Sequence, residues 1–149
     1  MRMQKKLFAV LLAAVMVFTM SLPVSAAGAA GRFSDVAADD WFADAVSYCN
    51  EGGLMIGTSG TEFSPYDTAS RTMLVTVLYR QAGSPAVEGN ADFTDVTPGS
   101  YYEKAVIWGK STEVVLGHDD GSFRPNDPVT REQFAALLWR MENKPAVSA

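Results

Sequence analysis

Two arginines in equivalent settings are the residues best suited to bind an anion. Arg71 and Arg131 lie sixty positions apart, and each directly follows a hydroxyl residue, Ser70 or Thr130, that can cap a helix. A guanidinium group binds a carboxylate through two parallel hydrogen bonds, which an ammonium group cannot do. The free amides and the positive dipole end of a helix start also favour an anion. These arginines therefore have the chemistry that recognition of an acidic ligand would need.

Other kinds of chemistry find little support in the residues. The acidic pairs Asp39-Asp40 and Asp119-Asp120 are adjacent in polar loops, as in solvated turns, and His118 is the single histidine. A calcium loop with Gly121 at its sixth position would place Leu116 where an oxygen ligand is needed. No nucleophile set, phosphate loop or dinucleotide fingerprint is present. We expect no enzyme activity, no cofactor and no metal site, with His118 in a solvent-facing loop.

The arginines belong to an internal repeat that runs without a gap. The motif Phe33-Ser34-Asp35-Val36 returns sixty positions later as Phe93-Thr94-Asp95-Val96. Further identical positions include Ala45, Val46, Gly57, Phe63, Pro65, Asp67, Arg71, Leu78, Arg80 and Pro85, which recur as Ala105, Val106, Gly117, Phe123, Pro125, Asp127, Arg131, Leu138, Arg140 and Pro145. A repeated unit of this size hides its apolar faces poorly alone, so the copies should pack together.

Each copy has the pattern of a helix, a glycine-containing loop and a second helix. The first helices should start near Asp40 and at a capping box, Ser100 to Glu103, and the second at Ser70 and at the capping box Thr130 to Gln133. The expected apolar stripes are Phe42, Ala45, Val46 and Cys49; Leu74, Val77, Leu78 and Gln81; Tyr102, Ala105 and Val106; and Phe134, Leu137, Leu138 and Met141. The apolar runs 54–57 and 114–117 could be extended or could end a helix. Gly117 and Gly121 should need a positive φ.

The first 26 residues have the features of a secretory signal peptide. A basic start with Arg2, Lys5 and Lys6 precedes an apolar stretch, and Val24-Ser25-Ala26 matches a cleavage site. Removing them lowers the formal net charge from −5 to −8, which argues against nucleic acid or another polyanion bound by bulk charge. We expect an exported chain without a membrane anchor, since the apolar stretch is short for a span. Cys49 is either a buried small hydrophobic residue or an intermolecular link.

Taken together, these motifs resemble the S-layer homology domain. The shared pattern combines F-x-D-V, an aromatic residue, A-V, an apolar run ending in glycine, D-G-x-F-x-P and V-T-R-E, and it extends from Phe33 to Pro145. The resemblance implies an all-α fold of tandem helix-loop-helix repeats, of which three usually form a pseudo-trimer with ligand grooves between neighbours. It also implies a secreted module that binds a secondary cell-wall polymer, commonly a pyruvylated glycan, on a bacterial surface. The implied organisation is a signal peptide (1–26), a leader (27–32), repeat 1 (33–85), a linker (86–92), repeat 2 (93–145) and a tail (146–149).

Site residues follow from the same resemblance, position by position. The implied glycan-binding residues are Arg131, Arg71, Asp95, Asp35, Tyr101, Trp41, Gly117 and Gly121. Trp41 or Tyr101 could cover the apolar face of a sugar ring, and the glycines would let the backbone approach the ligand. Structural alternatives remain: the arginine in a surface ion pair, the aspartates as turn residues that bind backbone amides, and the aromatic residues as packing.

The chain departs from the family pattern in three respects. It has two repeats instead of three, and Ser59-Gly60-Thr61-Glu62 replaces the aspartate-glycine loop. We also expect no further domain after the second repeat. The missing repeat predicts an unfilled apolar interface, hence self-association or recruitment of a repeat from another protein. The degraded first copy predicts that Arg131 matters more for binding than Arg71. The alternative function is a cell-surface protein-protein module that keeps the fold without glycan binding.

Overall fold

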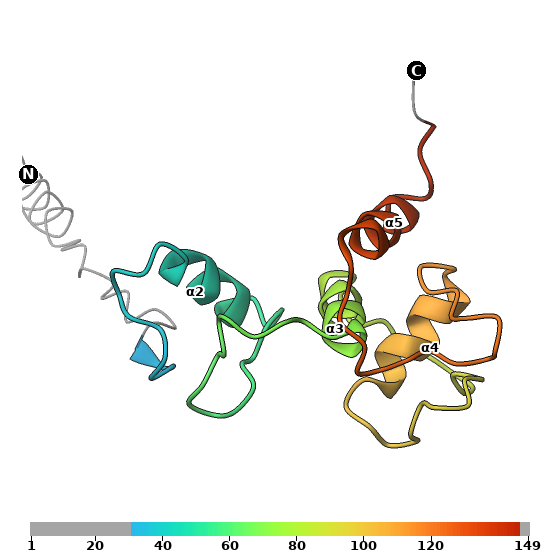
Figure 1. The fold of residues 1–149 in the computed structure, drawn as a ribbon, viewed down its shortest axis with the longest axis horizontal. Helices are drawn as coiled ribbons and strands as arrows, with labels where there is room; N and C mark the ends of the chain where they lie inside the picture. Colours follow the sequence, from blue (N-terminus) through green and yellow to red (C-terminus); the bar gives the residue numbers. More distant parts are fainter. Residues whose placement is uncertain (1–30, 147–149) are drawn as a thin grey trace, which may run out of the picture.

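The computed structural model describes residues 31–146, and this part of the chain is helical (Figure 1). It contains α2 (Ala43–Glu51), α3 (Arg71–Gln81), α4 (Glu103–Ser111) and α5 (Arg131–Met141). The described residues form no strand, only an isolated bridge between Ser70 and Pro128. The predicted all-α class is therefore confirmed, whereas the predicted signal peptide lies outside the described residues. Within residues 31–146, no helix is long and apolar enough to cross a membrane.

The second helix of each repeat begins at the predicted cap. The Ser70 hydroxyl accepts the Met73 amide at 3.3 Å at the start of α3. Thr130 caps α5 with the complete reciprocal box, in which its side chain accepts the Gln133 amide and Gln133 reaches back to the Thr130 amide. These contacts satisfy amides that a helix leaves unpaired at its first turn.

The predicted starts of the first helices are wrong by two or three residues. α2 begins at Ala43 because Asp40 uses its carboxylate earlier, accepting the Ala37 amide at 2.8 Å. In α4, Ser100 does not act as a cap, and its hydroxyl oxygen is buried without a partner among the described residues. Glu103 instead accepts the Gly99 amide at 2.8 Å. A tight turn therefore precedes each of these helices and uses the carboxylate of Asp40 or Glu103, which is then not available as a helix cap.

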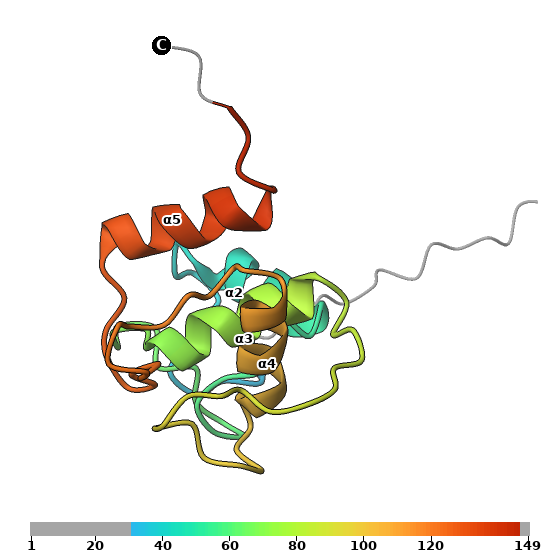
Figure 2. The same ribbon diagram turned by 90° about the vertical axis from the view of Figure 1, so that its right-hand side faces the viewer.

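The main hydrophobic core joins the two repeats. α3 of the first repeat packs against α4 of the second, and it is the only close helix pair in the described chain (Figure 2). The core contains side chains from α3, α4, α5 and the loops of repeat 2: Val75, Leu78, Ala91, Ala105, Val106, Ile107, Trp108, Val114, Val115, Phe123 and Leu137. Ala91 belongs to this core although it lies in the predicted linker. Packing between copies was predicted, and the structure assigns that packing to α3 and α4.

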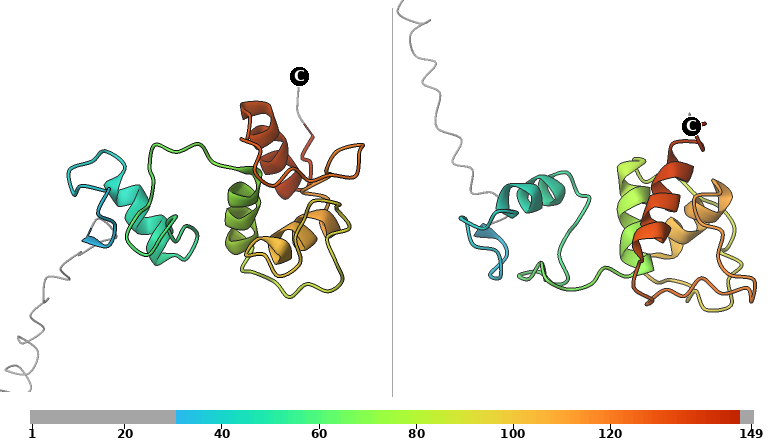
Figure 3. Two further views of the ribbon diagram at one scale, coloured as in Figure 1. Left: turned by 60° about the horizontal axis from the view of Figure 1, so that its bottom comes forward. Right: turned by 45° about the horizontal axis from the view of Figure 1, so that its top comes forward.

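A second, smaller core belongs to the first repeat alone. It consists of Phe33, Val36, Ala43 and Val46, with Phe42 and Phe63 packed against it. In both views of Figure 3, α2 stands apart from the group formed by α3, α4 and α5. The expected stripe on α2 is therefore only partly buried: Ala45 is exposed, whereas its counterpart Ala105 is 1% exposed. The difference arises because α4 has a helix beside it, whereas α2 has none within residues 31–146.

The loops between the helices of each repeat are irregular. The runs 54–57 and 114–117 form neither helix nor strand. Gly117 and Gly121 have φ angles of 72° and 77°, as predicted. A side chain at Gly117 would overlap with the ring of Phe93, so this position requires glycine for space as well as for conformation.

Candidate anion-binding site

Each repeat braces its loop with the aspartate of the F-x-D-V motif. Asp95 accepts the amides of Phe123 and Arg124, both at 2.8 Å. Asp35 accepts the equivalent amides of Phe63 and Ser64, at 2.9 and 2.7 Å. The Phe63 amide is the main cause of a lowered pKa at Asp35, because hydrogen bonds to a carboxylate favour its charged form. Both aspartates therefore organise a loop, as the turn-residue alternative stated.

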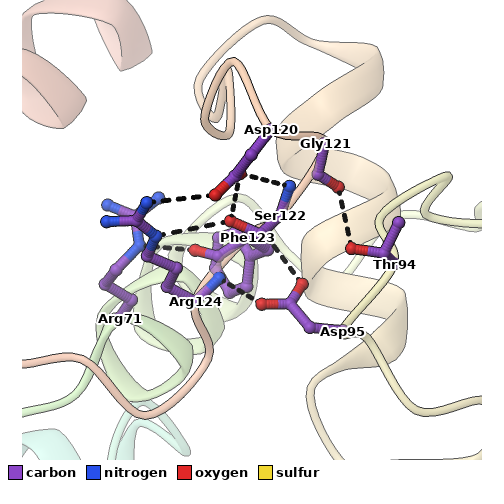
Figure 4. A network of polar contacts seen from close by, with 8 residues as sticks. All are labelled: Arg71, Thr94, Asp95, Asp120, Gly121, Ser122, Phe123 and Arg124. Atoms are coloured by element: carbon purple, nitrogen blue, oxygen red, sulfur yellow. Dashed lines mark hydrogen bonds and ion pairs between the residues drawn. The ribbon is translucent and has the colours of Figure 1, made fainter.

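The loop of repeat 2 carries a polar network that the first repeat lacks (Figure 4). Asp120 accepts the hydroxyl and amide of Ser122, and Arg124 donates to Asp120 at 3.1 Å. The Ser122 hydroxyl, followed by its amide and then Arg124, holds the pKa of Asp120 well below its usual range. Gly60, Glu62 and Ser64 occupy these positions in repeat 1, and Ser64 instead bonds Thr58 at 2.7 Å.

Arg71 crosses from the first repeat to this loop of the second. Its Nε donates to the Phe123 carbonyl at 2.8 Å, and its guanidinium lies over the Phe123 ring, 4.9 Å from the centroid. The Arg71 amide donates to the Asp127 carbonyl at 3.0 Å. Within residues 31–146, the two terminal nitrogens of Arg71 make no hydrogen bond. These two nitrogens therefore remain available to a ligand.

Arg71 and Arg124 place two positive charges at one position. Burial is the main cause of a lowered pKa at Arg71; Asp127 opposes the shift and the nearby positive charge of Arg124 adds to it. A guanidinium stays charged at neutral pH even so. Figure 4 shows the two arginine side chains next to each other beside the loop. We call Arg71, Arg124 and the loop 118–127 the junction site, because it joins the repeats.

Tyr101 lies next to the junction site from a third direction. Its hydroxyl is 3.1 Å from the Thr72 hydroxyl, in the first turn of α3. Its ring is 66% exposed and packs edge-on against Tyr102. Tyr101 therefore offers an exposed aromatic ring beside Thr72, the residue that follows Arg71.

The structure brings together five of the eight predicted site residues. Arg71, Asp95, Tyr101, Gly117 and Gly121 are at or next to the junction site. Arg131, Asp35 and Trp41 are not. Arg131 is exposed at the start of α5, Asp35 braces the first loop, and Trp41 is 92% exposed beside Phe42.

Arg124 is the residue that sequence reasoning missed. The differing loops were noticed, but Ser64 stands opposite Arg124 in the repeat, so Arg124 is not a recurring position. Its proximity to Arg71 depends on the packing of one repeat on the other. The available signal was its place inside the intact aspartate-glycine loop, next to Phe123.

No cluster of metal-binding side chains occurs among residues 31–146. His118 lies in a loop, as predicted, but it is half-buried, and its Nε2 is covered without a hydrogen-bond partner in the described chain. Its amide and carbonyl both bond within the loop, to Ser122 and Gly121. The histidine therefore packs into the loop that forms the junction site.

Comparison with known proteins gives matches over both repeats. The model of the S-layer homology domain matches residues 32–71 and 92–135. The chain is 34% identical over 135 residues to the surface-layer 125 kDa protein of Lysinibacillus sphaericus, covering 85% of this chain and 11% of that protein. It is 30% identical to the S-layer protein sap of Bacillus anthracis (90% of this chain, 16% of that protein). It is also 30% identical to an endoglucanase of Bacillus sp. strain KSM-635 (91% and 15%). The chain thus spans less than a fifth of the length of these relatives.

Proposed function

The chain belongs to the S-layer homology domain family, and from this premise we propose that it anchors non-covalently to a bacterial cell wall by binding an acidic secondary polymer. The relatives support a module that is separable from catalysis. Surface-layer proteins and an endoglucanase share the same segment, which is a small part of each. We propose a secreted, non-catalytic binding role for the segment.

The observation that carries the proposal is the arginine pair at the junction site. Arg71 and Arg124 come from different repeats, and Arg71 is half-buried with its Nε already bonded to the Phe123 carbonyl. An arginine held in this way loses little side-chain freedom when it binds a ligand. Its terminal nitrogens then present two donors to a carboxylate. A polymer carrying carboxylates, such as a pyruvylated glycan, has the required chemistry.

Tyr101 supplies the apolar half of a carbohydrate site. Sugar sites combine apolar surfaces with a few placed polar groups. The exposed ring of Tyr101 is tied to the start of α3 through Thr72, one residue from Arg71. We propose that the Tyr101 ring covers a sugar face while Arg71 and Arg124 bind the acidic group.

This geometry reverses the expected order of the two motif arginines. Arg71 lies against the intact loop of the second repeat, whereas the Arg131 side chain is exposed and makes no hydrogen bond within residues 31–146. We propose that Arg71 contributes more to wall binding than Arg131. The degraded loop of the first repeat is then of little consequence, because Arg71 does not use it.

Co-sedimentation with purified wall sacculi tests the proposal. The chain from residue 27 onward is mixed with protein-free sacculi that retain the secondary polymer and with sacculi from which it has been chemically removed. We expect binding to the first and not to the second. Arg71→Lys, which keeps the charge but not the paired donors, should weaken binding about tenfold or more. Arg131→Lys is the matched control and should change it little.

A second variant tests the same site in case the Arg71 variant loses binding because it misfolds. Arg124→Ser installs the residue found at the equivalent Ser64 and removes side-chain hydrogen bonds only to Asp120 and Ser122 in the same loop, so the fold should persist. It should also weaken binding, and added salt should weaken binding by the wild type. Sacculi lacking pyruvyl groups test the sugar modification separately. Equal binding to stripped and intact sacculi would refute the glycan proposal and favour the protein-protein alternative.

A further inference from the structure

Two helix faces lack a neighbour within the described chain, one at each end of the repeat pair. On α5, the side chains of Phe134, Leu138 and Trp139 are 45%, 41% and 44% exposed. On α2, Tyr48 is 73% exposed. Neither α2 nor α5 packs closely against another helix in residues 31–146. In Figure 1, α2 and α5 lie well apart, so one chain does not close these faces on each other.

The packing of α3 against α4 shows what such faces bind. Tyr79 on α3 packs against Trp108 on α4, with ring centroids 5.8 Å apart. Gly109 lies so close to Val75 that an added Cβ would be 3.1 Å from the valine methyl. The hydroxyls of Thr72 and Tyr101 are 3.1 Å apart. Three pairs therefore characterise this interface: an aromatic pair, a large-small pair and a hydrogen-bonding pair.

The aromatic pair has a counterpart on the two exposed faces. By the sixty-residue repeat, α5 is equivalent to α3 and α2 is equivalent to α4. Tyr79 and Trp108 correspond to Trp139 and Tyr48. The two aromatic types are exchanged between the helices, so a docked α2 and α5 would again pair a tryptophan with a tyrosine.

The other two pairs are complementary as well. Val75 and Gly109 correspond to Ala135 and Cys49. The side chain on α5 is smaller than its counterpart on α3, and the side chain on α2 is larger than its counterpart on α4, so the summed volume of the pair is roughly kept. Thr72 and Tyr101 correspond to Glu132, whose carboxylate accepts hydrogen bonds, and Trp41, whose indole N–H donates one. Cys49 is half-buried and Trp41 is 92% exposed in the described chain. All three pairs therefore keep matching size and chemistry.

We propose that α5 of one copy of this chain binds α2 of a second copy, head to tail, in the manner of α3 and α4. The contact joins two different surfaces, so it is heterologous and leaves one face of each kind available for further copies. The proposal rests on helix packing and does not require the proposed polymer binding. Its occupant is a second copy because the matching residues are found in this chain.

The same contact would give Arg131 the kind of neighbour that Arg71 has. It would not supply a second arginine, because Ser64 occupies the position equivalent to Arg124. Arg71 bonds Phe123, and the equivalent partner of Arg131 is Phe63. In a head-to-tail pair, Arg131 of one copy would therefore meet the loop around Phe63 of the next. The exposed position of Arg131 within one chain follows from the absence of that neighbour.

Two variants that block opposite faces distinguish this arrangement. Sedimentation velocity of the chain from residue 27, without polymer, should show concentration-dependent association. Trp139→Glu blocks α5 and Tyr48→Glu blocks α2, and each alone should weaken association about thirtyfold or more, as at an interface hot spot. An equimolar mixture should form a one-to-one dimer, because each variant retains the face that the other lacks. Leu116→Asn, at an exposed apolar residue outside both helix faces and outside the loop around Phe63, should behave like the wild type.

Disulfide crosslinking tests which residues of α5 and α2 meet in the proposed contact. The variant Ala135→Cys with Cys49→Ser carries a cysteine only on α5, and the wild type carries one only on α2. Mild oxidation of their mixture should give a disulfide-linked heterodimer. A control variant, Glu142→Cys with Cys49→Ser, should not. A monomer at every concentration, a mixture of blocked variants that stays monomeric, or equal crosslinking by both variants would overturn the proposal.

Discussion

α3 and α5 are equivalent helices in very different surroundings. Each has eleven residues and a hydroxyl cap, and each carries in its last turn an arginine that reaches back to its own repeat. Arg80 donates to the Leu54 carbonyl at 3.0 Å, and Arg140 donates to the Val114 carbonyl at 3.4 Å. Yet α3 buries Thr72, Val75, Thr76 and Leu78, whereas α5 buries Leu137 alone.

The difference shows that the next repeat decides how far the second helix is buried. α3 has α4 beside it and α5 has no helix beside it in the described chain. Leu78 is 2% exposed, and its counterpart Leu138 is 41% exposed. The hydrophobic contribution of a residue depends on the surface it removes from water, so identical residues contribute differently here.

The equivalent residues Leu78 and Leu138 should show the largest difference in stability between α3 and α5. Leu78→Ala should lower the free energy of unfolding by about 2 to 4 kcal/mol, because it leaves a cavity in the main core. Leu138→Ala should lower it by less than about 1 kcal/mol, because the side chain is already partly in water. Urea unfolding followed by circular dichroism, at concentrations where the chain is monomeric, measures both. Similar losses would show that α5 is buried as deeply as α3.

The helix caps should give a smaller effect of a different kind. Ser70→Ala and Thr130→Ala each remove a hydrogen bond to a first-turn amide, which is worth about 1 kcal/mol. Because α3 is part of the main core, loss of the Ser70 cap should lower the free energy of global unfolding. The loss at α5 should appear as faster local amide exchange in its first turn. Thr130→Ser is the conservative control, and a purely global effect at Thr130 would contradict the comparison.

Acidification should have the smallest effect on stability. It tests the aspartates of the two loops, Asp35 in repeat 1 and Asp120 in repeat 2. The carboxylates of Asp35 and Asp120 have lowered pKa values in the folded chain, so the stability they provide is present above the unfolded pKa of about 3.9. It is lost as the pH falls through the folded pKa values. The thermal midpoint should therefore change little between about pH 5 and 7 through these groups and fall below about pH 4.

Carboxylate titrations by NMR assign this loss to the loops. Asp120 should titrate below Asp35, because Asp120 accepts from Ser122 and Arg124 side chains as well as from an amide. Asp120→Asn should reduce the acid sensitivity of the second loop and leave the titration of Asp35 unchanged. A normal pKa at Asp120 would show that its network does not persist in solution.

Much of the local structure could be predicted from the sequence. The four helices, the caps at Ser70 and Thr130 and the positive φ angles of Gly117 and Gly121 follow from short-range patterns. The capping box at Ser100 failed because a hydroxyl residue three positions before a glutamate also fits a tight turn, and the backbone formed that turn. Such competition between local hydrogen bonds is decided by packing.

The candidate site shows the limit of that reasoning. The recurrence of Arg71 and Arg131 identified the arginines, but their different surroundings depend on contacts between residues fifty positions apart. Arg124 became part of the site only because α3 packs on repeat 2 and carries Arg71 to its loop. A repeat pattern treats both copies alike, whereas each copy has different neighbours in space.

The helices, the duplicated loops and the family could therefore be predicted from the sequence, because caps, glycines and apolar spacing act over a few residues. Three features depend on long-range packing: α3 lies in the core of the second repeat, Arg71 lies near Arg124, and α5 is largely exposed. The physical reason is that burial depends on which surfaces meet in space. Equivalent helices in one chain do not have equivalent neighbours.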